Sequence, residues 1–332
     1  MIGHQPLACQ VPYQNLFHAK TTPPAHLVLV GVTLRGVSAR IEIPASLAWL
    51  AGTPEGRRWL ADLPRLASQC LDMWALIPGE PFLASNVSLV VPVTRADGSD
   101  AVLKIQFPHR ESTGEADALQ LWQGVGAVQL LEHNPELHAL LIERCVPGVH
   151  LASIPADEAL DVVVSLLPRL WISDTGTITS LAEEAAGWSS SLPGAWGRAG
   201  QPFDRRLLNA ATDLLSELAI SQGDPVLLHQ DLHGDNILSA QREPWLAIDP
   251  KPLAGEREFG VASVVRAHEF GHSREAVRWR LDRLVGDLGL DRDRATAWSF
   301  AATLAWSIEG SEAVSHHVDT ARWLAERLTK SR

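Results

Sequence analysis

Two short segments carry most of the chemistry that this sequence offers. HQDLHGDNIL runs from His229 to Leu238, and IDPK runs from Ile248 to Lys251. Together they place a carboxylate at Asp231, an amide at Asn236 five residues later and a second carboxylate at Asp249 thirteen residues beyond that. Transfer of a phosphoryl group from a magnesium nucleotide needs a group that receives the proton of the attacking hydroxyl, and oxygen ligands for the metal. The spacing therefore predicts a kinase with Asp231 as base and with Asn236 and Asp249 on magnesium.

The chain between the two segments explains how these side chains meet. Residues 237–240 and 245–248 are short β-type runs around a Gln-Arg-Glu-Pro turn, the pattern of a β-hairpin. Because the two ends of a hairpin lie side by side, Asn236 and Asp249 are expected to reach one ion, close to Asp231. Asp and Asn also cap turns and helix starts. That simpler role accounts for each of the three residues singly, but not for all three around a hairpin.

Lysine is rare in this sequence, with 4 lysines against 24 arginines. Lys104 lies in the apolar run from Val102 to Ile105, where a strand buried on one face presents it inward, toward nucleotide phosphates. Glu115, in the following helix, is expected to pair with Lys104 and hold it extended. Glu111 is the competing partner, and a solvated strand lysine is the plainer alternative.

The histidines of the motif allow a second interpretation. His229 and His233, together with Asp235, have ligand types that bind transition metals. Histidines four residues apart converge only on a helix, and Gly234 with its β-type flanks argues against one. His229 is therefore expected to support the loop from within, and Lys251 to face a phosphate or a carboxylate near the site.

Composition limits the class of protein and of partner. The chain of 332 residues is 46% apolar and 20% charged, which is typical of a folded protein large enough for two lobes. The net charge is −11, and residues 152–332 hold 26 acidic and 18 basic groups. This charge favours a small and cationic hydroxylated acceptor and disfavours nucleic acid, although acidity also serves solubility.

Membrane and disulfide classes are disfavoured. No apolar run approaches the roughly 20 residues that span a bilayer, so no membrane partner is expected. The three cysteines, Cys9, Cys70 and Cys145, are widely spaced and form no CxxC pair, which argues against a disulfide framework or a structural zinc site. We expect a cytoplasmic protein, and the sequence leaves its oligomeric state open.

The hydrophobic period changes along the chain and predicts an α+β fold. Residues 1–38 have few charges and no sustained period, and are expected to be a poorly ordered N-terminal extension. Residues 39–146 are expected to form a small antiparallel sheet with one inserted helix. Residues 147–332 follow the break at Pro147 and form a larger, mostly helical lobe, with a Gly-, Ser- and Trp-rich loop around 187–202. The predicted helices are 44–74, 111–122, 156–172, 204–221, 258–270, 273–289, 292–309 and 312–329, and the predicted strands are 87–93, 101–105, 127–131, 139–144, 226–229, 237–240 and 245–248.

At these residues the chain resembles the aminoglycoside phosphotransferases, and within them the streptomycin 6-kinase and hydroxyurea phosphotransferase branch. Four stretches carry the resemblance, namely AVLKIQFPHRESTGEADALQLW, ALLIERCVPGVHL, LLHQDLHGDNIL and EPWLAIDPKPLAGEREF. The resemblance covers roughly residues 40–330, and WLAIDPKP is specific to the branch.

The resemblance implies a protein-kinase-like fold of two lobes, with ATP and Mg²⁺ as cofactors. It implies a hinge at about Glu143 to Gly148 that contacts adenine through its backbone, so Glu143 and Cys145 are nucleotide-binding candidates. It also implies the same roles as the spacing does, with Asp231 as base and with Asn236 and Asp249 on magnesium. Lys104 would bind the nucleotide phosphates, and Glu115 would pair with Lys104. The expected reaction is transfer of the γ-phosphoryl group to a small molecule, with streptomycin as the first acceptor and hydroxyurea as the runner-up.

Three positions depart from the family pattern. Gln230 stands where relatives usually carry Gly, and Gly260 stands where the family usually has an Asp that braces the catalytic loop. The segment from Ala84 to Ser88 contains no glycine where a Gly-rich nucleotide loop is expected, which leaves the phosphates to backbone amides and Ser88. These departures keep open a pseudokinase that only binds nucleotide.

The acceptor site is the least defined part of the sequence. Trp298, Trp306, Glu309 and Glu312 lie in late helical segments that are able to face a cleft. Tryptophan at helical spacing more often belongs to a core, so these residues are only candidates.

Overall fold

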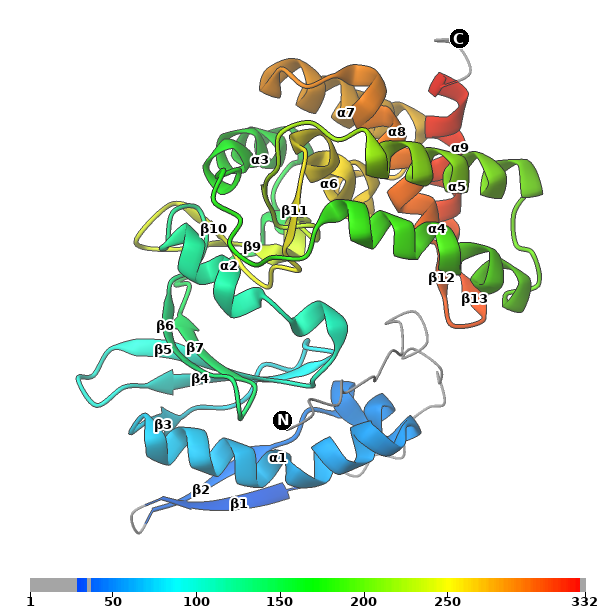
Figure 1. The fold of residues 1–332 in the computed structure, drawn as a ribbon. Helices are drawn as coiled ribbons and strands as arrows, with labels where there is room; N and C mark the ends of the chain where they lie inside the picture. The colour runs from blue at the N-terminus through cyan, green and yellow to red at the C-terminus, as the bar shows by residue number, and fades with distance from the viewer. Residues whose placement is uncertain (1–28, 35–36, 329–332) are drawn as a thin grey trace, which may run out of the picture.

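A five-stranded antiparallel sheet forms the smaller lobe of the molecule (Figure 1). The computed structural model describes residues 29–34 and 37–328. The strands lie in the order β3-β4-β5-β7-β6, and α2 (Glu115–Trp122) is inserted between β5 and β6. Their bounds are β3 (Ile77–Pro78), β4 (Ser88–Thr94), β5 (Asp100–Gln106), β6 (Leu130–Asn134) and β7 (Ala139–Glu143). The predicted small antiparallel sheet with one inserted helix is confirmed.

The two faces of this sheet have different neighbours, because side chains alternate along a strand. Leu103 and Ile105 of β5 share a hydrophobic cluster with α1 (Pro54–Met73). Val102 belongs instead to the cluster of the helical lobe. Lys104, two residues after Val102, lies on the same face, which is the face predicted from the strand pattern.

The helix predicted over residues 44–74 is divided in two. The 3-10 helix η2 (Ala45–Gly52) precedes α1, and the chain is extended at Thr53 between them. The Thr53 hydroxyl accepts a hydrogen bond of 3.0 Å from the Gly56 amide, and Pro54 occupies the first helical position. A capping threonine followed by proline starts a new helix, so the prediction of one continuous helix is wrong at this point.

The larger lobe is mostly helical and lies above the sheet lobe in Figure 1. Its helices are η4 (Leu151–Ser153), α3 (Ala156–Leu170), α4 (Leu181–Arg198), α5 (Arg205–Ile220), η5 (Gly234–Asn236), η6 (Arg257–Val261), α6 (Ala262–Arg266), η7 (His268–Phe270), α7 (Arg274–Leu288), α8 (Arg292–Ala305) and α9 (Ser315–Leu328). Three short pairs of strands accompany them, made by β8 (Val226–Leu228) with β11 (Leu253–Gly255), β9 (Ile237–Ser239) with β10 (Trp245–Ala247), and β12 (Ile308–Glu309) with β13 (Glu312–Ala313).

The segment predicted as a loop around 187–202 is largely helical. It belongs to α4, whose first turn is capped by Ser180 accepting a 3.1 Å hydrogen bond from Glu183. Trp188, Leu192 and Trp196 are buried and lie four residues apart, so they form one stripe of the helix. The prediction gave weight to glycine and serine content, and the spacing of the large side chains overrode it.

Two late helices were also predicted too long. α8 ends at Ala305, and the chain then forms the β12–β13 hairpin, turning at Gly310 with a φ of 63°. Residues 257–270 form three short helices, η6, α6 and η7, and the backbone is extended at Ala267 between α6 and η7. Apolar spacing indicated helix across these breaks, since hairpins of two residues per strand leave no period to detect.

The poorly ordered N-terminal extension predicted over 1–38 overlaps the described part of the chain only at residues 29–34 and 37–38. Residues 29–34 form β1 (Leu29–Leu34), which pairs antiparallel with β2 (Val37–Glu42). The prediction weighed prolines and missing charges above the Leu- and Val-rich run that forms β1. Residues 1–28 and 35–36 lie outside the described part of the chain.

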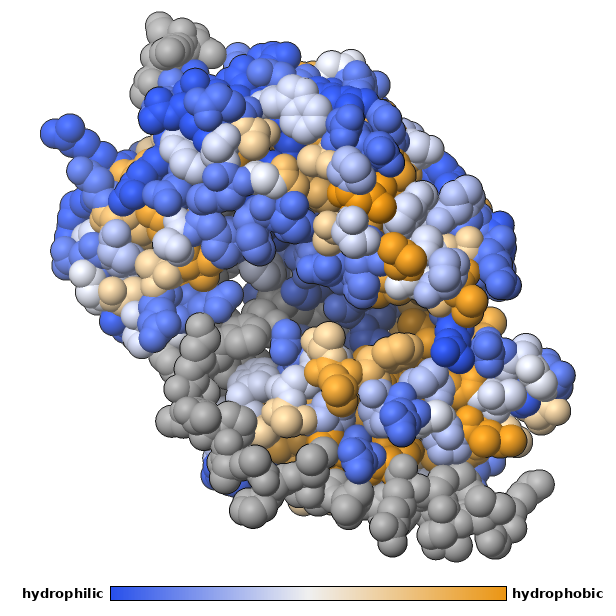
Figure 2. Space-filling model, turned by 180° about the vertical axis from the view of Figure 1, so that it is seen from behind, coloured by the Kyte–Doolittle hydropathy of each residue, from blue (hydrophilic) through white to orange (hydrophobic). Residues whose placement is uncertain are grey.

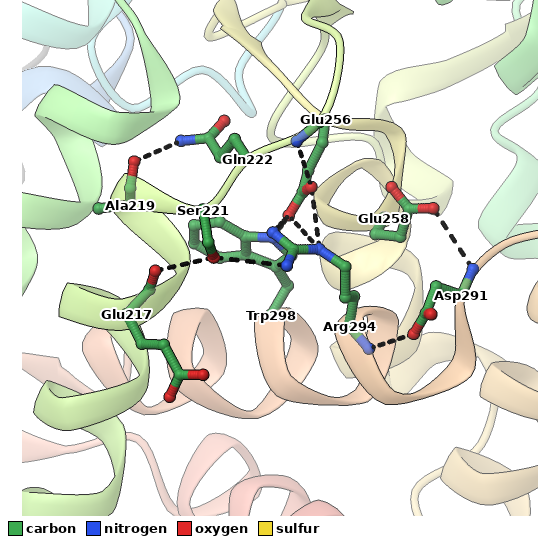
Figure 3. A network of polar contacts seen from close by, with 10 residues as sticks. Glu217, Ala219, Ser221, Gln222, Glu256, Glu258, Asp291, Arg294 and Trp298 are labelled. Atoms are coloured by element: carbon green, nitrogen blue, oxygen red, sulfur yellow. Dashed lines mark hydrogen bonds and ion pairs between the residues drawn. The ribbon is translucent and has the colours of Figure 1, made fainter.

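The buried carboxylate of Glu256 links the strand pair β8–β11 to helix α8 (Figure 3). Glu256 is 3% exposed and accepts hydrogen bonds from the Arg294 guanidinium at 2.6 and 3.0 Å, from the Gly223 amide at 3.0 Å and from the Trp298 indole. It follows β11 directly, and β11 pairs with β8. A charged acceptor with several donors is a strong anchor. Through the pairing of β11 with β8, this network also holds the strand that leads to Asp231.

Candidate active site

The predicted base lies on the segment between β8 and η5. Asp231 leaves β8 after Gln230, whose φ of 64° is in the left-handed region. That region costs an L-residue with a side chain roughly 1–2 kcal/mol, and glycine enters it without this cost. Asp249, at the end of the adjoining hairpin, also has a positive φ of 55°. Such strain persists where surrounding contacts fix the backbone, and it is frequent at functional sites.

The hairpin brings Asn236 and Asp249 together as the sequence predicts. Ala247 pairs with Ile237 at its open end, and the Ile248 amide donates to the Asn236 carbonyl over 2.9 Å. The Asn236 side-chain amide donates to the Asp231 carbonyl, also over 2.9 Å. The three residues are thereby linked into one site.

These residues fit a magnesium ion in chemical type. The side-chain nitrogen of Asn236 is engaged with Asp231, so its carbonyl oxygen is the atom that remains for a cation. The Asp249 carboxylate is 47% exposed, so a cation in solution can reach it. A carboxylate and an amide oxygen are ligands that magnesium takes together with water and phosphate oxygens.

Lys104 makes the ion pair predicted for it. Its ammonium lies 2.8 and 2.7 Å from the two carboxylate oxygens of Glu115 and also contacts Asp249. Gln106 donates to Glu115 at 2.6 Å. Burial raises the pKa of Glu115 to about 7 although Lys104 opposes this, and burial would lower the pKa of Lys104 if the Asp249 and Glu115 carboxylates did not raise it. The ammonium therefore stays charged between the inserted helix and the hairpin end.

Asp231 is surrounded by positive charge. Lys251 lies 2.8 Å from one of its oxygens and Arg266 lies 3.6 Å from the other. Burial alone would raise the pKa of Asp231, but Lys251, His233 and Arg266 together hold it well below its usual range. Asp231 is therefore ionised and able to accept a hydrogen bond from a hydroxyl.

The loop carrying Asp231 is supported although Gly260 replaces the usual aspartate. Ser263, at the start of α6, donates to the Leu232 carbonyl over 3.0 Å in a buried position. Trp171 occupies the space at Gly260, where a Cβ atom would lie 2.7 Å from the indole nitrogen. The Ser263 hydroxyl thus supports the loop. The Trp171 indole fills the space that a side chain at position 260 would need.

A second support acts further along the same loop, at His233 and Gly234. Glu269 accepts a 2.8 Å hydrogen bond from the Gly234 amide and lies 3.6 Å from His233. Gly234 is packed so closely that a Cβ atom would lie 2.8 Å from Phe270 and 2.9 Å from Ala152. The loop therefore turns under the side chains of η7 and η4.

The histidines of the motif have separate partners. His229 is buried, its Nε2 lies 2.9 Å from the Ile248 carbonyl, and its ring stacks on Trp122. Its pKa is lowered to about 4, mainly by burial. His229 supports the loop from within, as predicted, and the structure does not bring it together with His233 and Asp235 as a metal site would require.

The predicted hinge is fastened to the catalytic hairpin. Glu143 ends β7. Its two carboxylate oxygens accept hydrogen bonds of 2.8 Å from Nε and Nη2 of Arg242. Arg242 also donates to the Gly124 and Ala127 carbonyls, at 2.6 and 2.9 Å. Cys145 follows in a half-buried position, and burial raises its pKa to about 12. Arg242 was missed because its partners lie about 100 residues away.

The glycine-free segment before β4 differs from the expectation. Ser88 is only 2% exposed, so the structure does not present its side chain to a phosphate. The carbonyls of Ser85 and Asn86 instead accept hydrogen bonds of 2.6 and 2.8 Å from Ser46 and Trp49 of η2. The segment is therefore held by η2.

The residues predicted as acceptor candidates differ in burial and in their distance from Asp231. Trp298 is fully buried and bound to Glu256, so it is not at the cleft. Trp306 lies beside the base, with Lys251 5.3 Å and Arg266 5.4 Å from its ring. Glu309 and Glu312 are exposed and face each other across the β12–β13 hairpin.

The surface is hollowed between the two lobes (Figure 2). The site also joins the two lobes, since Lys104 of the sheet lobe contacts Asp249 of the helical lobe. Among the described residues, no helix has the length and apolarity to cross a membrane.

The amino-acid sequence is similar to those of known proteins. Residues 73–311 match the family described as aminoglycoside/hydroxyurea antibiotic resistance kinase. A hydroxyurea phosphotransferase from Kitasatospora aureofaciens is 41% identical over 289 residues, which cover 84% of this chain and 84% of that protein. A streptomycin 6-kinase from Streptomyces griseus is 40% identical over 285 residues, which cover 82% of this chain and 92% of that protein.

Known structures share the fold. The choline kinase LicA from Streptococcus pneumoniae superposes with a TM-score of 0.57 at 11% identity, covering 81% of this chain and 99% of that one. The aminoglycoside phosphotransferase APH(4)-Ia superposes with a TM-score of 0.52 at 15% identity, covering 80% and 96%. The predicted kinase-like fold of two lobes is confirmed.

Proposed function

This chain belongs to the aminoglycoside/hydroxyurea antibiotic resistance kinase family, and we propose that it transfers the γ-phosphoryl group of ATP to a hydroxyl of an aminoglycoside such as streptomycin. Family membership makes it a phosphotransferase with a small molecule as acceptor. The observation that carries the finer proposal is the convergence of Asp231, Asn236 and Asp249 with the Lys104–Glu115 ion pair at one cleft.

In the proposed reaction the acceptor oxygen attacks the γ-phosphorus, and the bond to the bridging oxygen of ADP breaks with its electron pair on ADP. Asp231 receives the proton of the acceptor hydroxyl. It is ionised by its cationic neighbours, so its main contribution is to orient the hydroxyl, with proton transfer late in a loose transition state.

Asn236 and Asp249 would hold magnesium, which neutralises charge on the β- and γ-phosphates. Lys104 contacts Asp249 in this structure, and we propose that it turns to the nucleotide phosphates while Glu115 keeps it extended. The backbone of the Glu143–Gly148 hinge would contact adenine, with Cys145 as part of its apolar wall.

Two acceptors remain in competition. The relatives at 41% and 40% identity carry the names hydroxyurea phosphotransferase and streptomycin 6-kinase, so similarity does not separate them. We favour streptomycin because residues 152–332 hold 26 acidic and 18 basic groups, which attracts a guanidinium-bearing molecule more than a neutral one.

The deciding experiment measures transfer of label from γ-labelled ATP, with Mg²⁺, to streptomycin and separately to hydroxyurea. Streptomycin should be labelled, with a KM that rises with salt because screening weakens attraction between opposite charges. Asp231→Ala serves as the inactive control. Labelling of hydroxyurea alone would assign the runner-up, and labelling of neither acceptor would refute the proposal.

A further inference from the structure

The two lysines of the site each face one of its two carboxylates. Lys104 contacts Asp249, and Lys251 lies 2.8 Å from Asp231. The role of Lys104 follows from its strand and its ion pair with Glu115. Lys251 helps to keep Asp231 ionised, and its position next to Asp231 allows a second role.

The ammonium of Lys251 pairs with Asp231 and is close enough to groups of both lobes to affect their pKa values. It lowers the pKa of Asp231 more than any other charge does, and it also lowers the pKa of Asp249. It acts across the cleft on His109 of the sheet lobe as well, where it adds to the effect of burial in lowering the pKa. A phosphoryl group that passes from a nucleotide held at Asp249 to an acceptor held at Asp231 would pass near this ammonium.

The backbone around Lys251 is fixed. Its amide donates to the His229 carbonyl over 3.1 Å, and Pro250 and Pro252 restrict φ on either side. Its side chain is 16% exposed and runs beside Trp306, with the ammonium 5.3 Å from the ring. The chain therefore holds this charge within a narrow region next to the base.

We propose that Lys251 is a further catalytic residue, which leaves Asp231 and donates hydrogen bonds to the transferred γ-phosphoryl group. The inference rests on the proposed phosphotransfer. While the acceptor oxygen forms its bond to phosphorus and the bond to ADP breaks, charge stays on the three equatorial oxygens. A lysine supplies a compact charge and three donors that follow this group as it moves. The acceptor proton still goes to Asp231.

The competing role is that Lys251 only keeps Asp231 ionised. The two roles differ in their dependence on pH. Without Lys251 the pKa of Asp231 rises. If Lys251 only keeps Asp231 ionised, a variant without this lysine loses activity at low pH and regains it at high pH. Loss of a contact to the phosphoryl group persists at every pH.

The first test compares Lys251→Met, Lys251→Arg and wild type in phosphotransfer to the acceptor that wild type uses. Removing one charge that stabilises a transition state typically lowers kcat 10²- to 10³-fold. We expect that loss for Lys251→Met from pH 6 to 9 with little change in either KM, and partial activity for Lys251→Arg, which also controls for folding. A kcat within threefold of wild type, or full recovery at high pH, overturns the proposal.

A matched control removes another cation that lies over an indole. Arg283 of α7 lies 5.9 Å from the Trp279 ring and makes surface ion pairs. Arg283→Met should leave kcat unchanged. A decrease equal to that of Lys251→Met would mean that loss of a cation–indole contact is sufficient, which contradicts the proposal.

The second test needs no turnover. With only 4 lysines in the chain, labelling of lysine ε-carbons with ¹³C gives a spectrum that single substitutions assign. Addition of Mg²⁺ and a non-hydrolysable ATP analogue, together with the acceptor, should shift the Lys251 signal, because the ammonium exchanges Asp231 for phosphate. An unmoved signal in protein that binds the analogue overturns the inference. If wild type transfers no label, the proposed function itself has failed.

Discussion

Removing the hydroxyl of Ser263 should loosen the catalytic loop without touching any group that contacts substrate. Ser263 is buried and donates to the Leu232 carbonyl, next to Asp231, over 3.0 Å. In Ser263→Ala that carbonyl is left in the interior without its donor. The loop should then depart from the geometry that presents the base.

The magnitude follows from the cost of an unsatisfied buried group. Leaving a buried acceptor without its donor costs about 1–3 kcal/mol. If about 2 kcal/mol falls wholly on the active geometry of the loop, kcat decreases about 30-fold. The KM for ATP should change little, because Ser263 lies behind the loop and not in the cleft.

Ser299 of α8 provides the matched control. It is fully buried, and its hydroxyl has no hydrogen-bond partner within the described part of the chain. Ser299→Ala removes an unpaired polar group, which is neutral or stabilising.

The assay combines urea denaturation with steady-state kinetics for the two serine variants and wild type. Ser263→Ala should lose stability and kcat, while Ser299→Ala should lose neither. Equal stability and equal kcat in both variants would refute the account of loop support.

Two further predictions concern the same region. Gly260→Ala should destabilise the protein by about 1–3 kcal/mol, because its Cβ atom would lie 2.7 Å from the Trp171 indole. Gly286→Ala in α7 meets nothing within 4 Å and should stabilise by about 0.5–1 kcal/mol; denaturation midpoints check both, and a Gly260 variant as stable as wild type would contradict the packing described. His229 should contribute a loss of stability as pH falls from about 6.5 to 4, because the pKa of this buried side chain is lowered to about 4 and the unfolded chain takes up a proton that the folded one does not. The decrease amounts to about 3 kcal/mol, and His229→Gln should flatten this part of the pH profile of unfolding; an unchanged slope would exclude His229 as its source.

The parts of the site that the sequence predicts are those fixed by local structure. Asn236 and Asp249 meet because a short hairpin joins them. Lys104 and Glu115 meet because a strand pattern and the next helix start lie 11 residues apart. In each case one element of known geometry fixes the distance between two side chains.

The supports of the site depend on distant contacts, which periodicity does not encode. Ser263 reaches Leu232 across 31 residues, and Arg242 reaches Glu143 across 99. No local pattern distinguishes such a serine or arginine from one at the surface. Both were therefore missed.

Tryptophans illustrate the same limit. α8 is buried along every residue from Ala295 to Ala305, so it has no polar face to show which side meets the cleft. Trp298 therefore read as an acceptor candidate although it binds Glu256 in the interior. Trp306, one residue after the helix, is the one beside the base.

The central claim is that Asp231, Asn236 and Asp249 form one phosphotransfer site, and ³¹P NMR of a single reaction mixture tests it most directly. With wild-type protein, MgATP and streptomycin, the account predicts ADP and a new phosphomonoester signal in equal amounts. With Asp231→Asn, which keeps the size of the side chain, ATP should still bind while the phosphomonoester forms at least 10³-fold more slowly. A phosphomonoester that forms at the wild-type rate in this variant would contradict the account.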